Sequence, residues 1–100
     1  MKTRNSRSPT QISAARQVAL GALAYLAGDP ERIGPFLAES GLSPADLRGA
    51  VGSAAFHVAL LDHLINHQEL LIAYAGEAEI DPGHVVAARE ILFHAEIGED

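Results

Sequence analysis

Residues 28–53, GDPERIGPFLAESGLSPADLRGAVGS, decide the fold class because helix starts and helix stops alternate along them. In each start, an Asp or Ser oxygen can accept the unpaired N–H groups of a first helical turn, and the proline that follows lacks an N–H that would have no partner there. In each stop, a glycine can adopt the backbone conformation that ends a helix. The starts are Asp29-Pro30 and Ser43-Pro44, and the stops are Gly28, Gly41 and Gly52. This stretch therefore predicts short helices and no strand.

The same signals extend the prediction in both directions along the chain. Upstream, apolar residues recur at helical spacing from Ile12 to Leu26, and no charged residue stands between Arg16 and Asp29. We expect this helix to be the most buried one or to lie in an oligomer contact. Downstream, further starts are expected at Ser53, at Asn66 with Glu69 three residues on, and at Asp81-Pro82. The sequence therefore predicts an all-α fold, a compact orthogonal bundle of about six short helices.

The length of 100 residues, of which 48% are hydrophobic, fits a single domain. We expect residues 1–9 to form a disordered basic leader, residues 10–97 a single all-helical domain, and residues 98–100 a frayed C-terminus. A shift of 38 residues aligns the first half of the chain with the second, pairing Tyr25 with His63, Leu26 with Leu64, and Pro44 with Pro82. Either the domain consists of two related three-helix units, or short helices that begin with proline simply resemble one another.

Charge and composition exclude several classes of function. Outside the leader, the chain has four arginines against thirteen acidic residues, which is a poor match for a phosphate backbone, so we do not expect this acidic part of the chain to bind nucleic acid. The apolar run VALGALAYLAG, residues 18–28, is too short to cross a bilayer, so we expect neither a membrane anchor nor a signal peptide. The absence of cysteine excludes disulfides, thiolate catalysis and cysteine zinc sites. We expect a cytoplasmic protein.

The stretch LDHLINHQELL, residues 61–71, poses the question of a metal site because His63 and His67 are four residues apart. On one continuous helix, both imidazoles would share a face. The helix start expected at Asn66 instead places His63 at the end of one helix and His67 at the beginning of the next. We therefore expect no metal and no other cofactor, and we keep His63 and His67 as the candidate metal ligands.

Catalytic motifs are also missing from the sequence. The chain has no HExxH motif, no GxSxG elbow and no glycine-rich phosphate loop. The serines Ser40, Ser43 and Ser53 stand at expected helix ends. We therefore expect a protein that is not an enzyme and has no catalytic residue.

The chain has more large apolar side chains than one small core requires, which indicates a contact surface. We predict a non-catalytic protein-interaction or self-association module whose partner is an unknown protein or a second copy of the chain. The predicted surface comprises Leu20, Leu23, Tyr25, Leu61, Leu64, Leu71 and Tyr74. Short helices wrapped around the first one could equally bury these residues. Two other functions stay open, namely small-ligand or divalent-metal binding through the histidines, and a nucleic-acid accessory role through the basic leader.

Three stretches together resemble a family of small bacterial proteins, mostly alphaproteobacterial, that is defined by a domain of unknown function. They are ARQVALGALAYLAGDPERIGPFLAESGLSPADLRGAV (15–51), LLDHLINHQELLIAYA (60–75) and DPGHVVAARE (81–90). The resemblance covers about residues 12–92, and residues 24–48 contribute most of it. It implies a compact all-helical domain and assigns no activity, cofactor or catalytic residue.

Overall fold

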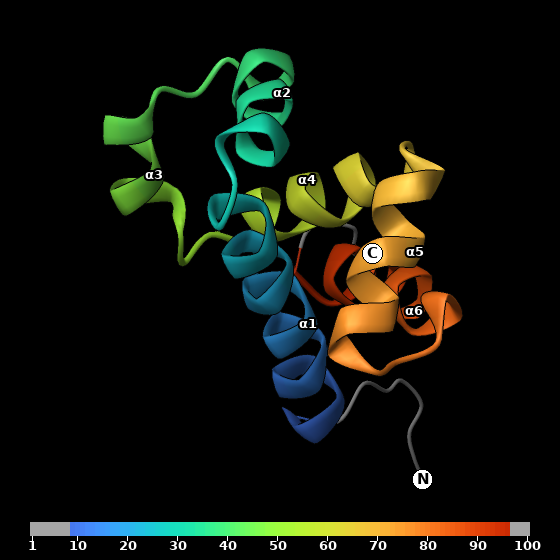
Figure 1. The fold of residues 1–100 in the computed structure, drawn as a ribbon. Coiled ribbons are helices and arrows are strands. Elements are labelled where there is room, and N and C mark those ends of the chain that lie inside the picture. Colours follow the sequence, from blue (N-terminus) through green and yellow to red (C-terminus); the bar gives the residue numbers. More distant parts are fainter. Residues whose placement is uncertain (1–8, 97–100) are drawn as a thin grey trace, which may run out of the picture.

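Six α-helices make up residues 9–96, the part of the chain that this computed structural model describes. In chain order they are α1 (Pro9–Ala27), α2 (Pro30–Ser40), α3 (Pro44–Ala50), α4 (Ala54–Ile65), α5 (Gln68–Ala78) and α6 (Pro82–Glu96) (Figure 1). These residues contain no strand, which confirms the all-α prediction, and none of their helices is long and apolar enough to cross a membrane. The expected leader and frayed end lie outside the described residues, except that Pro9 is the first residue of α1 rather than part of the leader.

Local side-chain hydrogen bonds begin four helices where the capping signals predicted them; at α6, the Asp81 carboxylate accepts the Gly83 N–H at 2.8 Å. The Asp29 carboxylate accepts the Glu31 N–H at 2.9 Å and so begins α2. At α3, the Asp46 N–H donates to Ser43 Oγ at 3.3 Å while the Ser43 N–H donates to Asp46 Oδ2 at 3.0 Å. This reciprocal pair is a capping box. Ser53 Oγ accepts an N–H from the first turn of α4 at 3.0 Å.

The start of the fifth helix lies one residue later than predicted. The Asn66 N–H donates to the Asp62 carbonyl at 2.9 Å, so Asn66 still belongs to the last turn of α4 and caps its C-terminus. His67 is the N-cap of α5, and its side chain makes no capping hydrogen bond. The prediction of two separate helices is confirmed, whereas the role assigned to Asn66 is wrong.

The core lies where α1, α4 and α6 pack against one another, with α5 alongside. Small residues on α1 allow the close approach of its neighbours, and large aliphatic residues on α4 and α6 fill the space. Burying one such aliphatic side chain stabilises the fold by about 1.5–3 kcal/mol. The most buried helix is α4, with seven buried residues, so the first alternative for α1, the greatest burial, is wrong, and its alternative, an oligomer contact, stays a prediction. The fully buried members are Ala19, Ala22, Leu26, Leu60, Leu61, Leu64, Val85 and Leu92.

The helices α2 and α3 lie to one side of this core (Figure 1). α3 has no buried residue, and α2 has one, Phe36. The Phe36 ring packs edge-on against Phe56 and His63 of α4, with centroid distances of 5.8 and 5.4 Å. Phe36 is therefore the apolar contact that attaches α2 to α4.

Helix boundaries repeat along the chain with the shift of 38 residues found in the sequence. α1 and α4 end at Ala27 and Ile65, α2 and α5 cover residues 30–40 and 68–78, and α3 and α6 begin at Pro44 and Pro82. The C-caps of α2 and α5 are also equivalent, and both have left-handed backbones. This agreement supports the hypothesis of two related three-helix units.

Candidate functional site

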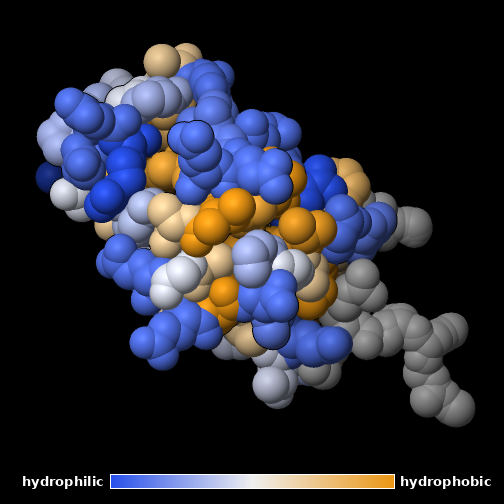
Figure 2. Space-filling view, turned by 45° about the vertical axis from the view of Figure 1, so that its right-hand side comes forward, coloured by the Kyte–Doolittle hydropathy of each residue, from blue (hydrophilic) through white to orange (hydrophobic). Residues whose placement is uncertain are grey.

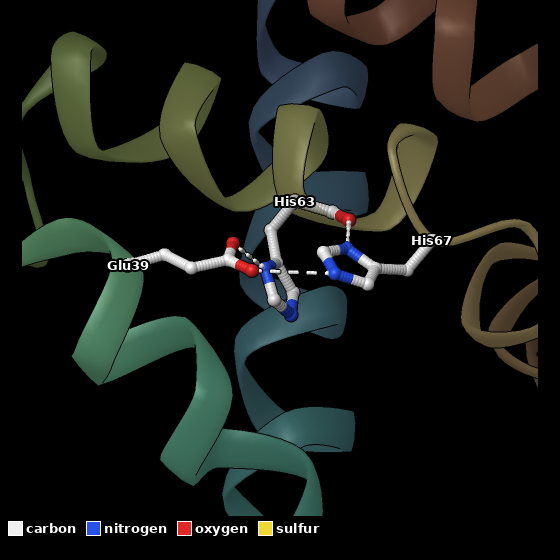
Figure 3. A group of neighbouring side chains, drawn as sticks. All are labelled: Glu39, His63 and His67. Carbon is white, nitrogen blue, oxygen red and sulfur yellow. Dashed lines mark hydrogen bonds and ion pairs between the residues drawn. The ribbon is translucent and has the colours of Figure 1, made fainter.

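The corner between α4 and α5 brings His63 and His67 together instead of separating them (Figure 3). Their ring centroids lie 4.3 Å apart. The His67 Nδ1–H donates to the main-chain carbonyl of His63 at 2.7 Å, which holds the His67 ring over the end of α4. The expectation that a helix break would keep the imidazoles apart is therefore wrong, because only residues 66 and 67 connect the two helices.

Glu39, in the last turn of α2, adds a third polar side chain to this corner (Figure 3). The His63 Nδ1–H donates to Glu39 Oε1 at 2.8 Å, and Glu39 Oε2 lies 3.3 Å from His67 Nε2. Phe36, three residues earlier on α2, shares this face of the helix and packs against the His63 ring. Sequence reasoning missed Glu39 because helical spacing shows that Phe36 and Glu39 share a face, but not which helix that face meets.

The three side chains differ strongly in burial. His63 is 3% exposed and Glu39 is 53% exposed. His67 is intermediate between them, at 42%. His63 Nε2 has no hydrogen-bond partner among the described residues. Hollows of about 290 and 220 Å³ both have His63 in their lining. The site therefore combines one fixed, buried imidazole with two side chains that reach solvent.

Chemically, the corner offers two imidazole nitrogens and one carboxylate oxygen, with one such atom from each residue lying within 4.8 Å of the others. Nitrogen and oxygen donors in this arrangement can bind a divalent ion or share protons. Other histidines have separate roles. His57 Nε2–H donates to the Val51 carbonyl at 2.6 Å beneath the α3–α4 connection, and His94 pairs with Glu90 at 3.1 Å on the surface of α6.

The residues of the predicted interaction surface do not form one exposed face. Leu61, Leu64, Leu71 and Tyr74 belong to the buried core, Leu23 and Tyr25 pack against its edge, and Leu20 is 37% exposed. The expectation of a shared surface is corrected because α1, α4 and α5, the helices that contain these residues, each pack against more than one other helix. A wide apolar stripe on a helix is therefore used for the core.

A groove runs along α5 on the side that faces the end of α1 and the start of α2. It consists of two hollows, of about 290 and 410 Å³, that share the Arg32 side chain as a common wall. We call it the α5 groove; its lining includes Tyr25, Arg32, Leu70, Ala73, Tyr74 and Ala78, together with the exposed acids Glu31, Glu69 and Glu77. Figure 2 shows hydrophobic side chains gathered on the face that carries α5, with hydrophilic residues around them.

Comparison with known proteins places the chain in a family but assigns it no activity. The family described as "Protein of unknown function (DUF3572)" matches residues 12–95. Because this match covers most of the chain, the protein belongs to that family, which confirms the resemblance seen in the sequence. No curated protein and no solved structure matches the chain significantly.

Proposed function

We propose that this member of a family of unknown function is a cytoplasmic, non-catalytic protein-interaction module whose α5 groove receives a segment of another protein. The observation that carries the proposal is the combination of apolar walls with an acidic border. Tyr25 is a partly exposed wall of one hollow, and its ring centroid lies 5.6 Å from that of the buried Tyr74. Aromatic side chains of this kind are enriched where proteins bind one another.

The shape of the groove suits a short helical segment. Leu70 and Ala78 are eight residues apart on α5, a distance of about 12 Å along the helix axis, or roughly two helical turns. Ala73 and Ala78 are small, so an incoming helix can approach the α5 backbone between them. An amphipathic helix that docks in an apolar groove is a common mode of peptide recognition.

Charge favours a basic partner over a second copy of this chain. Glu31, Glu69 and Glu77 are exposed and line the groove, with Arg32 as the cation between its two hollows. The chain has a formal net charge of −6, so a second copy would bring further negative charge to this border. A segment with leucines on one face and lysines or arginines beside them would complement both features.

The test is a titration of the ¹⁵N-labelled full chain with two synthetic amphipathic helical peptides that have the same leucines, one flanked by lysines and the other by glutamates. We expect the lysine peptide alone to shift the amide signals of Leu70, Ala73 and Ala78. Ala73→Arg should abolish these shifts, whereas Ala38→Arg, at an exposed position of α2 outside the groove, should leave them unchanged.

Two results would overturn this proposal. Equal shifts with both peptides, or shifts scattered away from α5, would show that the groove does not select a basic helix. A dimer in sedimentation that Ala73→Arg dissociates would make a second copy of the chain the occupant.

A further inference from the structure

We propose that Glu39, His63 and His67 bind one divalent transition-metal ion, with zinc as the best match, where α2 meets the α4–α5 corner. His63 and His67 line one hollow of the α5 groove, but the site goes beyond the interaction role and does not depend on it. The contacts of His67 determine which of its ring nitrogens carries a hydrogen. Its Nδ1 atom lies 2.7 Å from the His63 carbonyl oxygen, and because a carbonyl can only accept, Nδ1 has to carry the hydrogen.

A neutral His67 ring then presents the lone pair of Nε2 to Glu39. The distance from Nε2 to Glu39 Oε2 is 3.3 Å, and an ionised carboxylate oxygen is likewise an acceptor. Two acceptors at this distance repel each other unless a cation lies between them. That cation can be a proton on one of the two atoms or a metal ion bound to both.

The position of His63, the third possible ligand, favours the metal ion. Zinc lies about 2.0–2.2 Å from nitrogen and oxygen ligands, so two ligand atoms of a tetrahedral site are about 3.3–3.6 Å apart. Glu39 Oε2 and His67 Nε2 already have this separation, at 3.3 Å, and Glu39 Oε1 is 2.8 Å from His63 Nδ1. A metal ion bound to all three residues therefore requires the exposed Glu39 carboxylate to rotate away from His63, while the His63 ring lies between Phe36 and His67.

The outer contacts of the two histidines differ. The bond from His67 Nδ1–H to a backbone carbonyl is the outer interaction that commonly orients a metal-binding imidazole. Metal at His63 Nδ1 requires the ring hydrogen to move to Nε2. Because Nε2 has no partner among the described groups, this change of tautomer breaks only the bond to Glu39, and it leaves the buried Nε2–H without an acceptor there.

His67 has a structural role, because its Nδ1–H donates to the His63 carbonyl in the last turn of α4, but that role leaves Nε2 facing Glu39. His67 is the N-cap of α5 but makes no capping bond, whereas Asp29, the N-cap of α2 at the equivalent place 38 residues earlier, accepts the Glu31 N–H. A residue type that caps poorly thus occupies a cap position and points its free nitrogen at Glu39. Imidazole nitrogens select zinc, cobalt or nickel over calcium or magnesium, and three protein ligands leave one coordination position open.

The experiment is calorimetric titration of the full chain with zinc chloride after dialysis against a chelator, with the cobalt(II) absorption spectrum as an independent report on the ligand geometry. The variants are His67→Asn and Glu39→Gln, because both positions are partly exposed and their substitution leaves the core intact. The control is His94→Asn, since His94 is also exposed and paired with a glutamate, Glu90, but has no third ligand. Far-UV circular dichroism checks that each variant is folded.

We expect one zinc ion per chain, an affinity loss of about a hundredfold or more in His67→Asn and in Glu39→Gln, and no loss in His94→Asn. The proposal is overturned if the wild type binds no zinc, if either ligand variant binds as tightly as the wild type, or if the control weakens equally. It is also overturned if long-range ¹H–¹⁵N spectra show that His67 Nε2 stays protonated under saturating zinc, since the cation in the corner would then be a proton.

Discussion

Gly21 and Tyr74 show at the scale of single residues how closely α1 and α5 approach. The Tyr74 hydroxyl donates to the Val18 carbonyl at 2.8 Å, and it occupies the place where a Cβ atom at Gly21 would lie. We predict that Gly21→Ala lowers the free energy of unfolding by about 1–2 kcal/mol. Alanine has the better helix propensity, but displacement of the Tyr74 hydroxyl destabilises the fold by more than this propensity stabilises it. In a Tyr74→Phe background the obstructing oxygen is gone, so the same substitution should cost nothing. Urea denaturation of the four chains measures both effects, and equal effects in the two backgrounds would contradict the steric argument.

The same tyrosine predicts how stability depends on pH. Burial raises the pKa of Tyr74 above its usual value of 10.0. The folded state thus favours the protonated hydroxyl, whose contribution is complete below about pH 10, where the unfolded chain titrates, and is lost as the pH rises through the folded-state pKa. We expect the urea midpoint of the wild type to fall more steeply above pH 10 than that of Tyr74→Phe. Parallel curves for the two proteins would show that ionisation of this hydroxyl is not linked to unfolding.

At the scale of the helices, sequence reasoning succeeded because helix ends depend on local chemistry. Asp29, Ser43 and Ser53 cap the helices that they were predicted to begin, and each needs only an N–H two or three residues away. The corner at Asn66 was misplaced by one residue, because a cap signal does not show whether the preceding helix has already ended. Because of this error, the sequence prediction did not place His67 at the N-cap of α5.

The equivalent C-caps of α2 and α5 make a prediction about helix ends. Gly41 and Glu79 both have left-handed backbones, with φ of 77° and 60°. A side chain in this conformation costs about 1–2 kcal/mol, which glycine avoids at some cost in chain entropy. Glu79→Gly should therefore raise the free energy of unfolding by about 0.5–1 kcal/mol. The control Glu77→Gly, inside α5, should lower it by about 1 kcal/mol, and thermal denaturation that gave both variants the same sign would refute the left-handed cap as the cause.

At the scale of the whole molecule, the contacts that create the candidate site could not be predicted from the sequence. The apolar stripe of α2 shows that Phe36 and Glu39 share a face, but their meeting with His63 depends on how α2 folds back onto α4. Apolar periodicity likewise does not distinguish a side chain that packs inside the chain from one that packs against a partner. Leu61 and Leu64 were assigned to an interaction surface for this reason, and the structure buries both completely.

Leu64 gives the most direct test of whether this core belongs to one chain. We predict that Leu64→Ala lowers the free energy of unfolding by about 2–5 kcal/mol, because the cavity it leaves lies inside the bundle. Leu20→Ala, at a side chain that is 37% exposed, should change it by less than about 0.5 kcal/mol. Urea denaturation at protein concentrations about a hundredfold apart should give the same values, because a contact within one chain does not respond to mass action. Stability that rises with concentration in the wild type but not in Leu64→Ala would mean that Leu64 stabilises an assembly of chains. Its burial within one chain would then not fully explain its contribution to stability.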